Sequence, residues 1–106
     1  MTQPMFVLVQ FSVKDFPKYF EHYGSLMSAV VAKFGGQFLA ATRNVVVKEG
    51  ESSGNFTAVI RFPSKEAAIE MYESPEYAPL KTKRIDELTD GGNLIFIPGL
   101  ETAQLE

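Results

Sequence analysis

The sequence predicts a single α+β domain in which helices cover one face of an antiparallel sheet. Short segments rich in Val, Ile and Phe alternate with segments whose apolar residues recur every three to four positions, a pattern typical of strands alternating with amphipathic helices. The chain has 106 residues, which is enough for one hydrophobic core and too few for two. Hydrophobic residues make up 45% of the chain, so we expect it to be folded rather than disordered.

The first strand and the first helix are predicted from the segment 5–34. Residues 5–11, "MFVLVQF", are rich in β-forming residues and predict a strand. Asp15 is placed to cap the helix that follows, and Pro17 falls in its first turn, where a missing N–H is harmless. Apolar residues then recur with the helical period as far as Phe34, and the Gly35-Gly36 pair predicts the stop.

The middle of the chain predicts a hairpin. Residues 37–42, "QFLAAT", and 44–50, "NVVVKEG", predict strand interrupted near Arg43 by a bulge or kink. "ESSGN" then predicts a turn, and residues 56–62, "FTAVIRF", predict the strand that pairs with the preceding one.

The second half of the chain predicts two more helices and a last strand. Ser64 is placed to cap one helix, and Ser74 to cap another with Pro75 at its first position. The second of these is expected to run irregularly to about Leu88, where "DGG" ends it. Residues 93–99, "NLIFIPG", predict the last strand. We expect the core to span about residues 5–99 of a single domain, 1–106, with a flexible C-terminal tail.

The predicted order of elements is β-α-β-β-α-α-β, which is ferredoxin-like with an extra short helix before the last strand. Such a sheet carries its helices on one face, so its strands normally alternate apolar and polar residues. The segments "FVLV" and "LIFI" do not alternate, because they are apolar on both faces. We therefore expect the open face to be covered as well, and a second copy of the chain is the expected cover.

Four segments carry a resemblance to a known family: "KFGGQFLA", "VVKEG", "RFPSKEAA" and "YESPEYAPLKTKR". The likeness spans roughly residues 7–99, and the spacing of these segments is similar to that of a bacterial family of unknown function. That family belongs to the dimeric α/β-barrel superfamily, which also holds the antibiotic-biosynthesis monooxygenases. The resemblance implies a ferredoxin-like homodimer with the two sheets packed face to face. It implies no activity.

Composition excludes several classes of protein. The net charge is −3 with acidic and basic residues interspersed, which argues against nucleic-acid binding. The absence of Cys excludes disulfides and sulfur-based metal sites. No apolar run approaches the ~20 residues of a membrane helix, and no basic leader begins the chain, so we expect a soluble, cytoplasmic protein. No ligand cluster or phosphate loop stands out, so neither a metal nor a cofactor is expected.

Arg84 is the most specific candidate for a site. On a helical wheel it shares a face with Tyr77 and Leu80, so it is expected to point inward and not into solvent. A buried guanidinium needs an anionic or carbonyl partner. That partner is either Glu49, in which case the pair is structural, or an acidic ligand held in a pocket.

The other candidate ligand-binding residues are aromatic or titratable. Tyr23, Tyr72 and Tyr77 are expected to line a pocket with Arg84 between the helices and the sheet. His22 is the only histidine, and it lies on the flank of its helix, where either a structural or a functional role is open. The sequence identifies no catalytic residue.

Three functions therefore remain open from the sequence. The first is a dimeric protein that binds a small organic molecule, with an acidic group as one option. The second is a cofactor-free monooxygenase- or isomerase-like enzyme, which would need only to desolvate and orient its substrate. The third is a non-catalytic dimerisation or stress-associated module. A deep pocket with converging polar groups would favour the first two.

Overall fold

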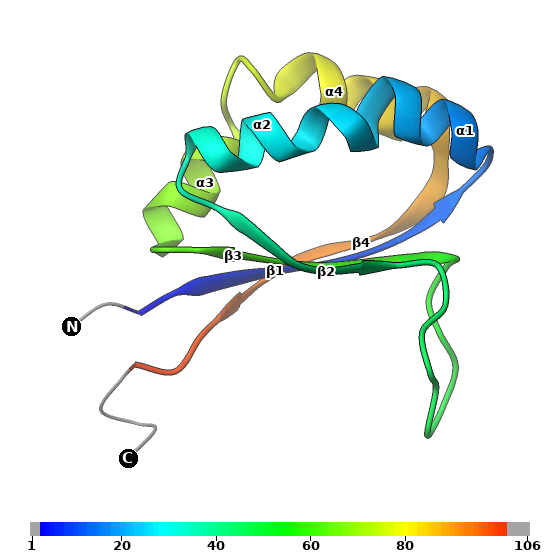
Figure 1. The fold of residues 1–106 in the computed structure, drawn as a ribbon, viewed down its shortest axis with the longest axis horizontal. Helices are drawn as coiled ribbons and strands as arrows, with labels where there is room; N and C mark the ends of the chain where they lie inside the picture. The colour runs from blue at the N-terminus through cyan, green and yellow to red at the C-terminus, as the bar shows by residue number, and fades with distance from the viewer. Residues whose placement is uncertain (1–2, 102–106) are drawn as a thin grey trace.

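The computed structural model describes residues 3–101 and shows an α+β domain with one antiparallel sheet (Figure 1). Its strands are β1 (Met5–Val13), β2 (Gln37–Thr42), β3 (Phe56–Phe62) and β4 (Thr89–Pro98). They lie in the order β2-β3-β1-β4, and each neighbouring pair is antiparallel. The two central strands are thus β3 and β1, which are far apart in the sequence. The predicted loose tail falls, from residue 102 onward, outside the described residues.

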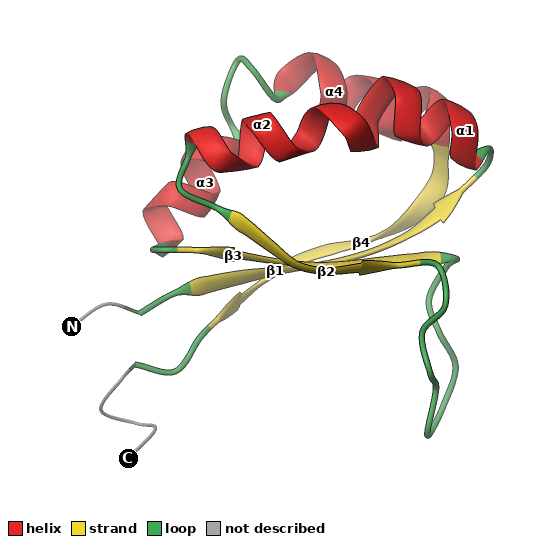
Figure 2. Ribbon diagram, viewed as in Figure 1, coloured by secondary structure: helices red, strands yellow, loops and turns green. Residues whose placement is uncertain are grey.

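All helices lie over the same face of the sheet (Figure 2). They are α1 (Phe16–Tyr19), the π-helical segment η1 (Phe20–Gly24), α2 (Ser25–Lys33), α3 (Lys65–Tyr72), α4 (Ala78–Lys83) and the π-helical segment η2 (Arg84–Leu88). The first three form one continuous rod, and α4 continues directly into η2. Within residues 3–101, no helix is both long enough and apolar enough to cross a membrane.

Two of the predicted helix caps are confirmed. The side chain of Asp15 accepts a hydrogen bond from the backbone N–H of Lys18, and Pro17 occupies the first turn of α1. The Ser64 side chain likewise accepts from the N–H of Ala67 at the start of α3. Both side chains satisfy N–H groups that a helix cannot pair internally.

Ser74 caps a turn rather than a helix. Its hydroxyl donates to the carbonyl of Met71 at 2.7 Å and accepts from the N–H of Tyr77 at 3.1 Å. The helix predicted to begin at Pro75 instead begins as α4 at Ala78. The consequence is that Ser74 and Tyr77 are both buried beneath this turn.

Two π-helical segments were not expected from the sequence, because the apolar period alone does not distinguish a π turn from an α turn. η1 widens the first rod, and Tyr19, Tyr23 and Met27 are all buried along it at intervals of four residues. η2 begins at Arg84, which is buried. π turns inside helices often occur at functional positions. Here the two segments supply a tyrosine and an arginine that lie close together.

The strand predicted at residues 44–50 is wrong. Residues 44–50 form an exposed loop, because they have no strand opposite them: β2 last pairs at Thr42 with Thr57. Just before β3, both the carbonyl and the amino group of the Asn55 side chain bond instead to the backbone of Val13 in β1.

The "DGG" segment does not end a helix but lies within β4. Gly91 and Gly92 have φ values of +88° and +136°, and they lie where the pairing of β1 with β4 shifts register. A Cβ atom on Gly92 would lie 2.1 Å from the carbonyl oxygen of Gln10. These glycines therefore allow a bulge that an L side chain would obstruct.

The core lies between the helices and the inner face of the sheet. Alternate residues of β1 from Met5 to Val13 are buried there, whereas the residues between them are only partly buried. The predicted apolar character of the other face is confirmed: Phe6 and Leu8 of β1 lie beside Ile97 and Ile95 of β4. No helix of the described chain covers this outer face (Figure 2).

Candidate functional site

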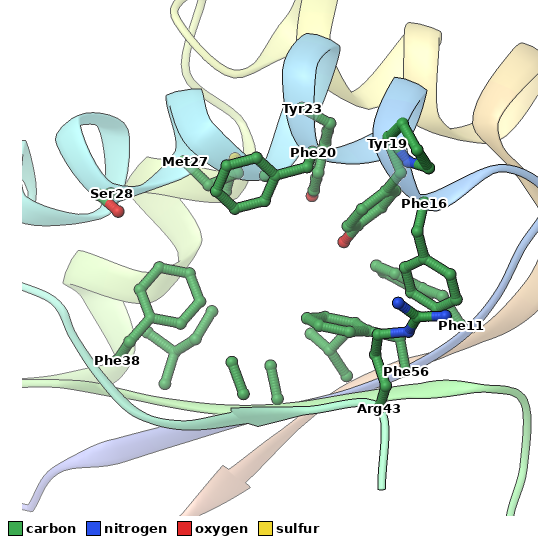
Figure 3. Close-up of a pocket in the computed structure, with 16 residues that line it drawn as sticks. Phe11, Phe16, Tyr19, Phe20, Tyr23, Met27, Ser28, Phe38, Arg43 and Phe56 are labelled. Atoms are coloured by element: carbon green, nitrogen blue, oxygen red, sulfur yellow. The ribbon is translucent and has the colours of Figure 1, made fainter.

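A cavity of about 570 Å³ lies between the helix layer and the inner face of the sheet (Figure 3). Its upper wall comes from α1, η1 and α2, and its floor comes from the inner faces of β1, β2 and β3. Its larger apolar lining residues are Val9, Phe11, Phe16, Phe20, Met27, Phe38, Phe56 and Ile60. Tyr19, Tyr23 and Arg43 add the main polar groups.

Aromatic contacts shape the upper wall. The Tyr19 ring centroid lies 5.2 Å from that of Tyr23 and 5.5 Å from that of Phe56. Both tyrosines come from the same apolar stripe of the first helical rod, and Phe56 comes from the start of β3. Tilted rings at these separations are favourable aromatic pairs. They leave both tyrosine hydroxyl oxygens on the cavity side (Figure 3).

The part of the upper wall that Tyr19 and Tyr23 form is called the inner wall. It is backed by a polar cluster of Tyr23, Tyr77 and Arg84. The hydroxyl oxygens of Tyr23 and Tyr77 lie 2.7 Å apart. Nη2 of Arg84 donates to the Tyr77 hydroxyl over 3.4 Å. Arg84 is only 6% exposed, so the prediction that it points inward is confirmed.

The Arg84 guanidinium also lies against aromatic faces. Its Cζ atom is 4.4 Å from the Phe11 ring centroid and 5.9 Å from that of Tyr23. A guanidinium within about 6 Å of a ring face is attracted by the ring quadrupole. Arg84 is therefore held by its hydrogen bond to the Tyr77 hydroxyl and by the ring faces of Phe11 and Tyr23.

Of the two partners left open for Arg84, Glu49 does not pair with it. Glu49 is exposed in the loop between β2 and β3, and the ion pairs of residues 3–101 do not include it with Arg84. Figure 1 shows that this loop extends below the sheet, whereas the helices lie above it, and Arg84 begins the helical segment η2. The sheet itself separates the two charges.

Burial sets the charge state of this cluster. It raises the pKa of the Tyr19 hydroxyl, which the positive charge of Arg84 only partly opposes. Burial, together with the neighbouring Tyr77, also raises the pKa of Tyr23. Burial by itself lowers the pKa of Arg84, but the hydroxyls of Tyr77 and Tyr23 more than offset it and the net shift is upward. At neutral pH, both cavity tyrosines are therefore neutral donors beside a buried cation.

The outer rim of the cavity carries a second arginine. The Cζ atom of Arg43 lies 3.7 Å from the Phe16 ring centroid, and the residue is exposed. Phe20 and Phe38 also line the cavity and are 66% and 36% exposed. The rim thus combines exposed aromatic rings with a solvated positive charge.

The predicted site residues do not line a single pocket. Tyr23 lines the large cavity, whereas Tyr72 and Arg84 line a smaller cavity of about 290 Å³ beside Gly91 and Gly92 of β4. Tyr77 lies buried between them, with 1% of its surface exposed. The ring of Phe11 lines both cavities and divides them.

His22 lies outside both cavities. It is exposed, and its Nε2 atom is 3.9 Å from a carboxylate oxygen of its neighbour Glu21. Its place on the flank of η1 directs it away from the tyrosine cluster, so the structure gives it no part in this site. Within residues 3–101, no group of three or more His, Asp or Glu side chains gathers as metal ligands would.

Tyr19, Arg43 and Phe56 are site residues that the sequence did not predict. Tyr19 had a usable signal, since it precedes Tyr23 by four residues on the same apolar stripe. Phe56 had a weaker one, as the first residue of a predicted strand. Arg43 had none, because its contact with Phe16 joins residues that are distant in the sequence.

Comparison with known proteins defines the relatives of this chain. Residues 4–100 match the model of a family described as a domain of unknown function (DUF1330). No curated protein matches the sequence.

Solved structures share its fold at low sequence identity. A protein of unknown function from Rhodopseudomonas palustris is 17% identical with a TM-score of 0.72, over 92% of this chain and 83% of that one. An ethyl tert-butyl ether D (EthD) family protein from Bacillus halodurans is 17% identical with a TM-score of 0.60, over 96% of this chain and all of that one. At such identities the likeness establishes the fold alone.

Proposed function

The chain belongs to this DUF1330 family of domains of unknown function, and from the geometry of its cavity we propose that it binds a small, largely apolar organic molecule there. The observation that carries the proposal is the cavity itself. Its volume of about 570 Å³ lies within the range of roughly 300–1,000 Å³ typical of ligand sites. Its lining is mostly aromatic and aliphatic with a few converging polar groups, as in such sites.

The arrangement of the polar groups favours a ligand with two different ends. Tyr19 and Tyr23 present hydroxyls at the inner wall, and Arg43 presents a guanidinium at the rim. The surface between them is apolar, which suits a flat or aromatic body. A carboxylate at the outer end of the ligand would lie beside Arg43, which is exposed and therefore pairs at a small desolvation cost.

Binding to this cavity is tested by filling it. Ala41 lies on the cavity floor, so Ala41→Phe is expected to occupy much of the space. Binding of methylnaphthalene, measured by ligand-observed NMR, should then fall at least tenfold. Ala29→Phe adds the same ring at an exposed position of α2 and serves as the control. Equal binding by both variants would refute the assignment of the ligand to this cavity.

We also propose that the chain forms a homodimer through the outer face of the sheet, which gives a dimeric α/β barrel of two ferredoxin-like protomers. The register places Phe6, Leu8, Val59, Ile95 and Ile97 next to one another on that face. Ile95 and Ile97 are 48% and 41% exposed in the single chain. A contiguous apolar patch of this kind marks an interaction surface, and a second copy covers it symmetrically.

The loop between β2 and β3 supports a second copy as the occupant of that face. It extends on the outer side of the sheet, away from the helices (Figure 1). It exposes three consecutive valines, Val45, Val46 and Val47, of which Val46 is 81% exposed. These side chains would pack against a partner that sits on the outer face.

A matched pair of lysine substitutions tests the dimer. Ile95 on the outer face and Leu26 on α2 are both 48% exposed. Ile95→Lys is expected to yield monomers in analytical ultracentrifugation at micromolar concentration, whereas Leu26→Lys should leave a dimer of the wild-type mass. A wild-type protein that sediments as a monomer, or an Ile95→Lys dimer of normal affinity, would refute the proposed interface.

A further inference from the structure

We propose that the inner wall of the large cavity is a hydrogen-bond donor site that selects ligands by an acceptor oxygen, and that it favours an ionised phenol or enol oxygen over a neutral group. The proposal rests on the proposed function, because it assigns a polarity to the same cavity. It follows from the direction in which protons must point through the cluster of Arg84, Tyr77 and Tyr23.

The direction is set at Arg84. A guanidinium has five N–H donors and no acceptor, so its contact with the Tyr77 hydroxyl has only one possible sense. Nη2 of Arg84 donates, and the Tyr77 oxygen accepts over 3.4 Å. The hydroxyl proton of Tyr77 must therefore find another acceptor.

Tyr23 provides that acceptor. Its hydroxyl oxygen lies 2.7 Å from that of Tyr77, and within residues 3–101 the Tyr77 hydroxyl has no recorded side-chain partner other than Tyr23 and Arg84. If Tyr23 were the donor, the proton of Tyr77 would be buried without an acceptor, which is unfavourable by about 1–3 kcal/mol. Tyr77 therefore donates to Tyr23.

The hydroxyl proton of Tyr23 is then available for donation to a group in the cavity. The Tyr23 side chain lines the cavity, and its hydroxyl lies on the cavity side (Figure 3). The Tyr19 hydroxyl also points into the cavity, and no recorded hydrogen bond within the described residues occupies it. Two neutral phenols thus present donor protons to the same space, as an oxyanion-binding site does.

The charge of Arg84 gives this wall a preference for anionic oxygen. Arg84 is 6% exposed, and within residues 3–101 its Nε atom has no hydrogen-bond partner and no carboxylate forms an ion pair with it. A buried cation without a negative partner is electrostatically uncompensated. Because Arg84 is buried, its attraction for a negative oxygen beside Tyr19 and Tyr23 is stronger than that between two solvated charges.

Naphthol and methylnaphthalene with the same substitution pattern test the proposal. They have similar size, but only naphthol offers an oxygen that can ionise. We expect naphthol bound to the wild-type protein to ionise about one pH unit lower than free naphthol does. The absorbance of the naphtholate reports this ionisation. Tyr23→Phe should weaken naphtholate binding roughly tenfold to a hundredfold and leave methylnaphthalene binding unchanged.

Tyr72→Phe is the matched control, because Tyr72 lines the smaller cavity and contributes no hydroxyl to the large one. It should bind both probes as the wild type does. Thermal unfolding of Tyr23→Phe establishes that the variant is folded before its affinity is compared. If Tyr23→Phe does not fold, Tyr19→Phe, which removes the second donor, should show the same selective loss of naphtholate binding.

The outcomes separate the two proposals. If both probes bind with equal affinity, and naphthol ionises as it does in water, the donor site is refuted while ligand binding in the cavity stands. The same conclusion follows if the Tyr→Phe variants weaken both probes equally. If neither probe binds the wild-type protein, the proposed function fails together with the donor site.

Discussion

The two faces of the sheet contain similar apolar residues but lie in different environments. On the inner face, Val7 and Val9 are 1% and 5% exposed beneath the helices. On the outer face, Ile95 and Ile97 are 48% and 41% exposed, although they belong to a strand that pairs directly with β1. An apolar strand therefore indicates that both of its faces need cover, but it does not show what provides that cover.

The inner face is itself divided into a packed half and a hollow half. Near α3, the residues Val31, Phe62 and Ala68 are almost completely buried against one another. Beneath η1, the rings of Tyr19 and Phe56 surround the large cavity instead. Packing thus stabilises one half, whereas the other half has space for a ligand and a polar wall to orient it.

The largest expected effect comes from placing one charge on either face of β1. Val7→Asp would bury a carboxylate without a partner in the packed core, so we expect the chain not to fold. Leu8→Asp places the same carboxylate on the outer face, where the monomer keeps its helical circular dichroism but the proposed dimer dissociates. If both variants fold with similar urea midpoints, the two faces do not differ as described.

The next largest effect is expected at Arg84, on the inner side. Arg84→Ala removes a buried side chain that contacts Phe11 and hydrogen-bonds Tyr77. The cavity and the unpaired hydroxyl that remain should lower the free energy of unfolding by about 2–4 kcal/mol. Arg84→Met keeps most of the volume and should recover part of this loss. A wild-type urea midpoint for Arg84→Ala would show that the guanidinium is not an anchor.

Alkaline pH is expected to destabilise the fold through the two buried tyrosines of the hollow half. The pKa values of Tyr19 and Tyr23 are raised by burial, so the unfolded chain releases these protons near pH ~10 while the folded chain retains them. A group with a raised folded-state pKa stabilises the fold below its unfolded pKa, and this stability is lost as the pH rises toward the folded value. Above pH ~10 the free energy of unfolding should therefore fall by about 1.4 kcal/mol per pH unit for each tyrosine.

Urea unfolding at several alkaline pH values measures that slope. Tyr19→Phe should reduce the slope by one tyrosine's contribution, and Tyr72→Phe should leave it unchanged, because both buried cavity tyrosines remain. An identical slope in wild type and Tyr19→Phe would mean that the Tyr19 hydroxyl does not stay protonated in the folded protein.

Local features of the fold were predictable from the sequence. Asp15 and Ser64 cap helices because their side chains need only the N–H groups three residues ahead. The burial of Arg84 followed from its place two turns after Tyr77 on one helical face. Each of these predictions depends on residues that are close together in the chain.

Features that depend on distant residues were not predictable. Residues 44–50 have a strand-like composition, but they form a loop because no strand lies opposite them beyond the pairing of Thr42 with Thr57. Glu49 was one of two partners considered for Arg84, but it lies in the loop between β2 and β3, which extends on the side of the sheet opposite the helices. The cavity has the same origin, since it exists only where η1, β2 and β3 come together.

The smallest expected effect concerns the rim, where Arg43 differs from Arg84 in exposure and not in charge. Arg43 is solvated and stacked on Phe16, so Arg43→Gln should change the free energy of unfolding by less than about 0.5 kcal/mol. Its effect should be confined to acidic ligands. At low salt, Arg43→Gln should bind naphthoate a few-fold more weakly than the wild type does, and it should bind methylnaphthalene with wild-type affinity. Added salt should remove the difference in naphthoate affinity because exposed charges are screened. Glu49→Gln, which removes an exposed charge of the same loop, is the control and should change neither affinity. A loss of methylnaphthalene binding in Arg43→Gln would instead show that this arginine shapes the cavity and does not merely attract charge to its opening.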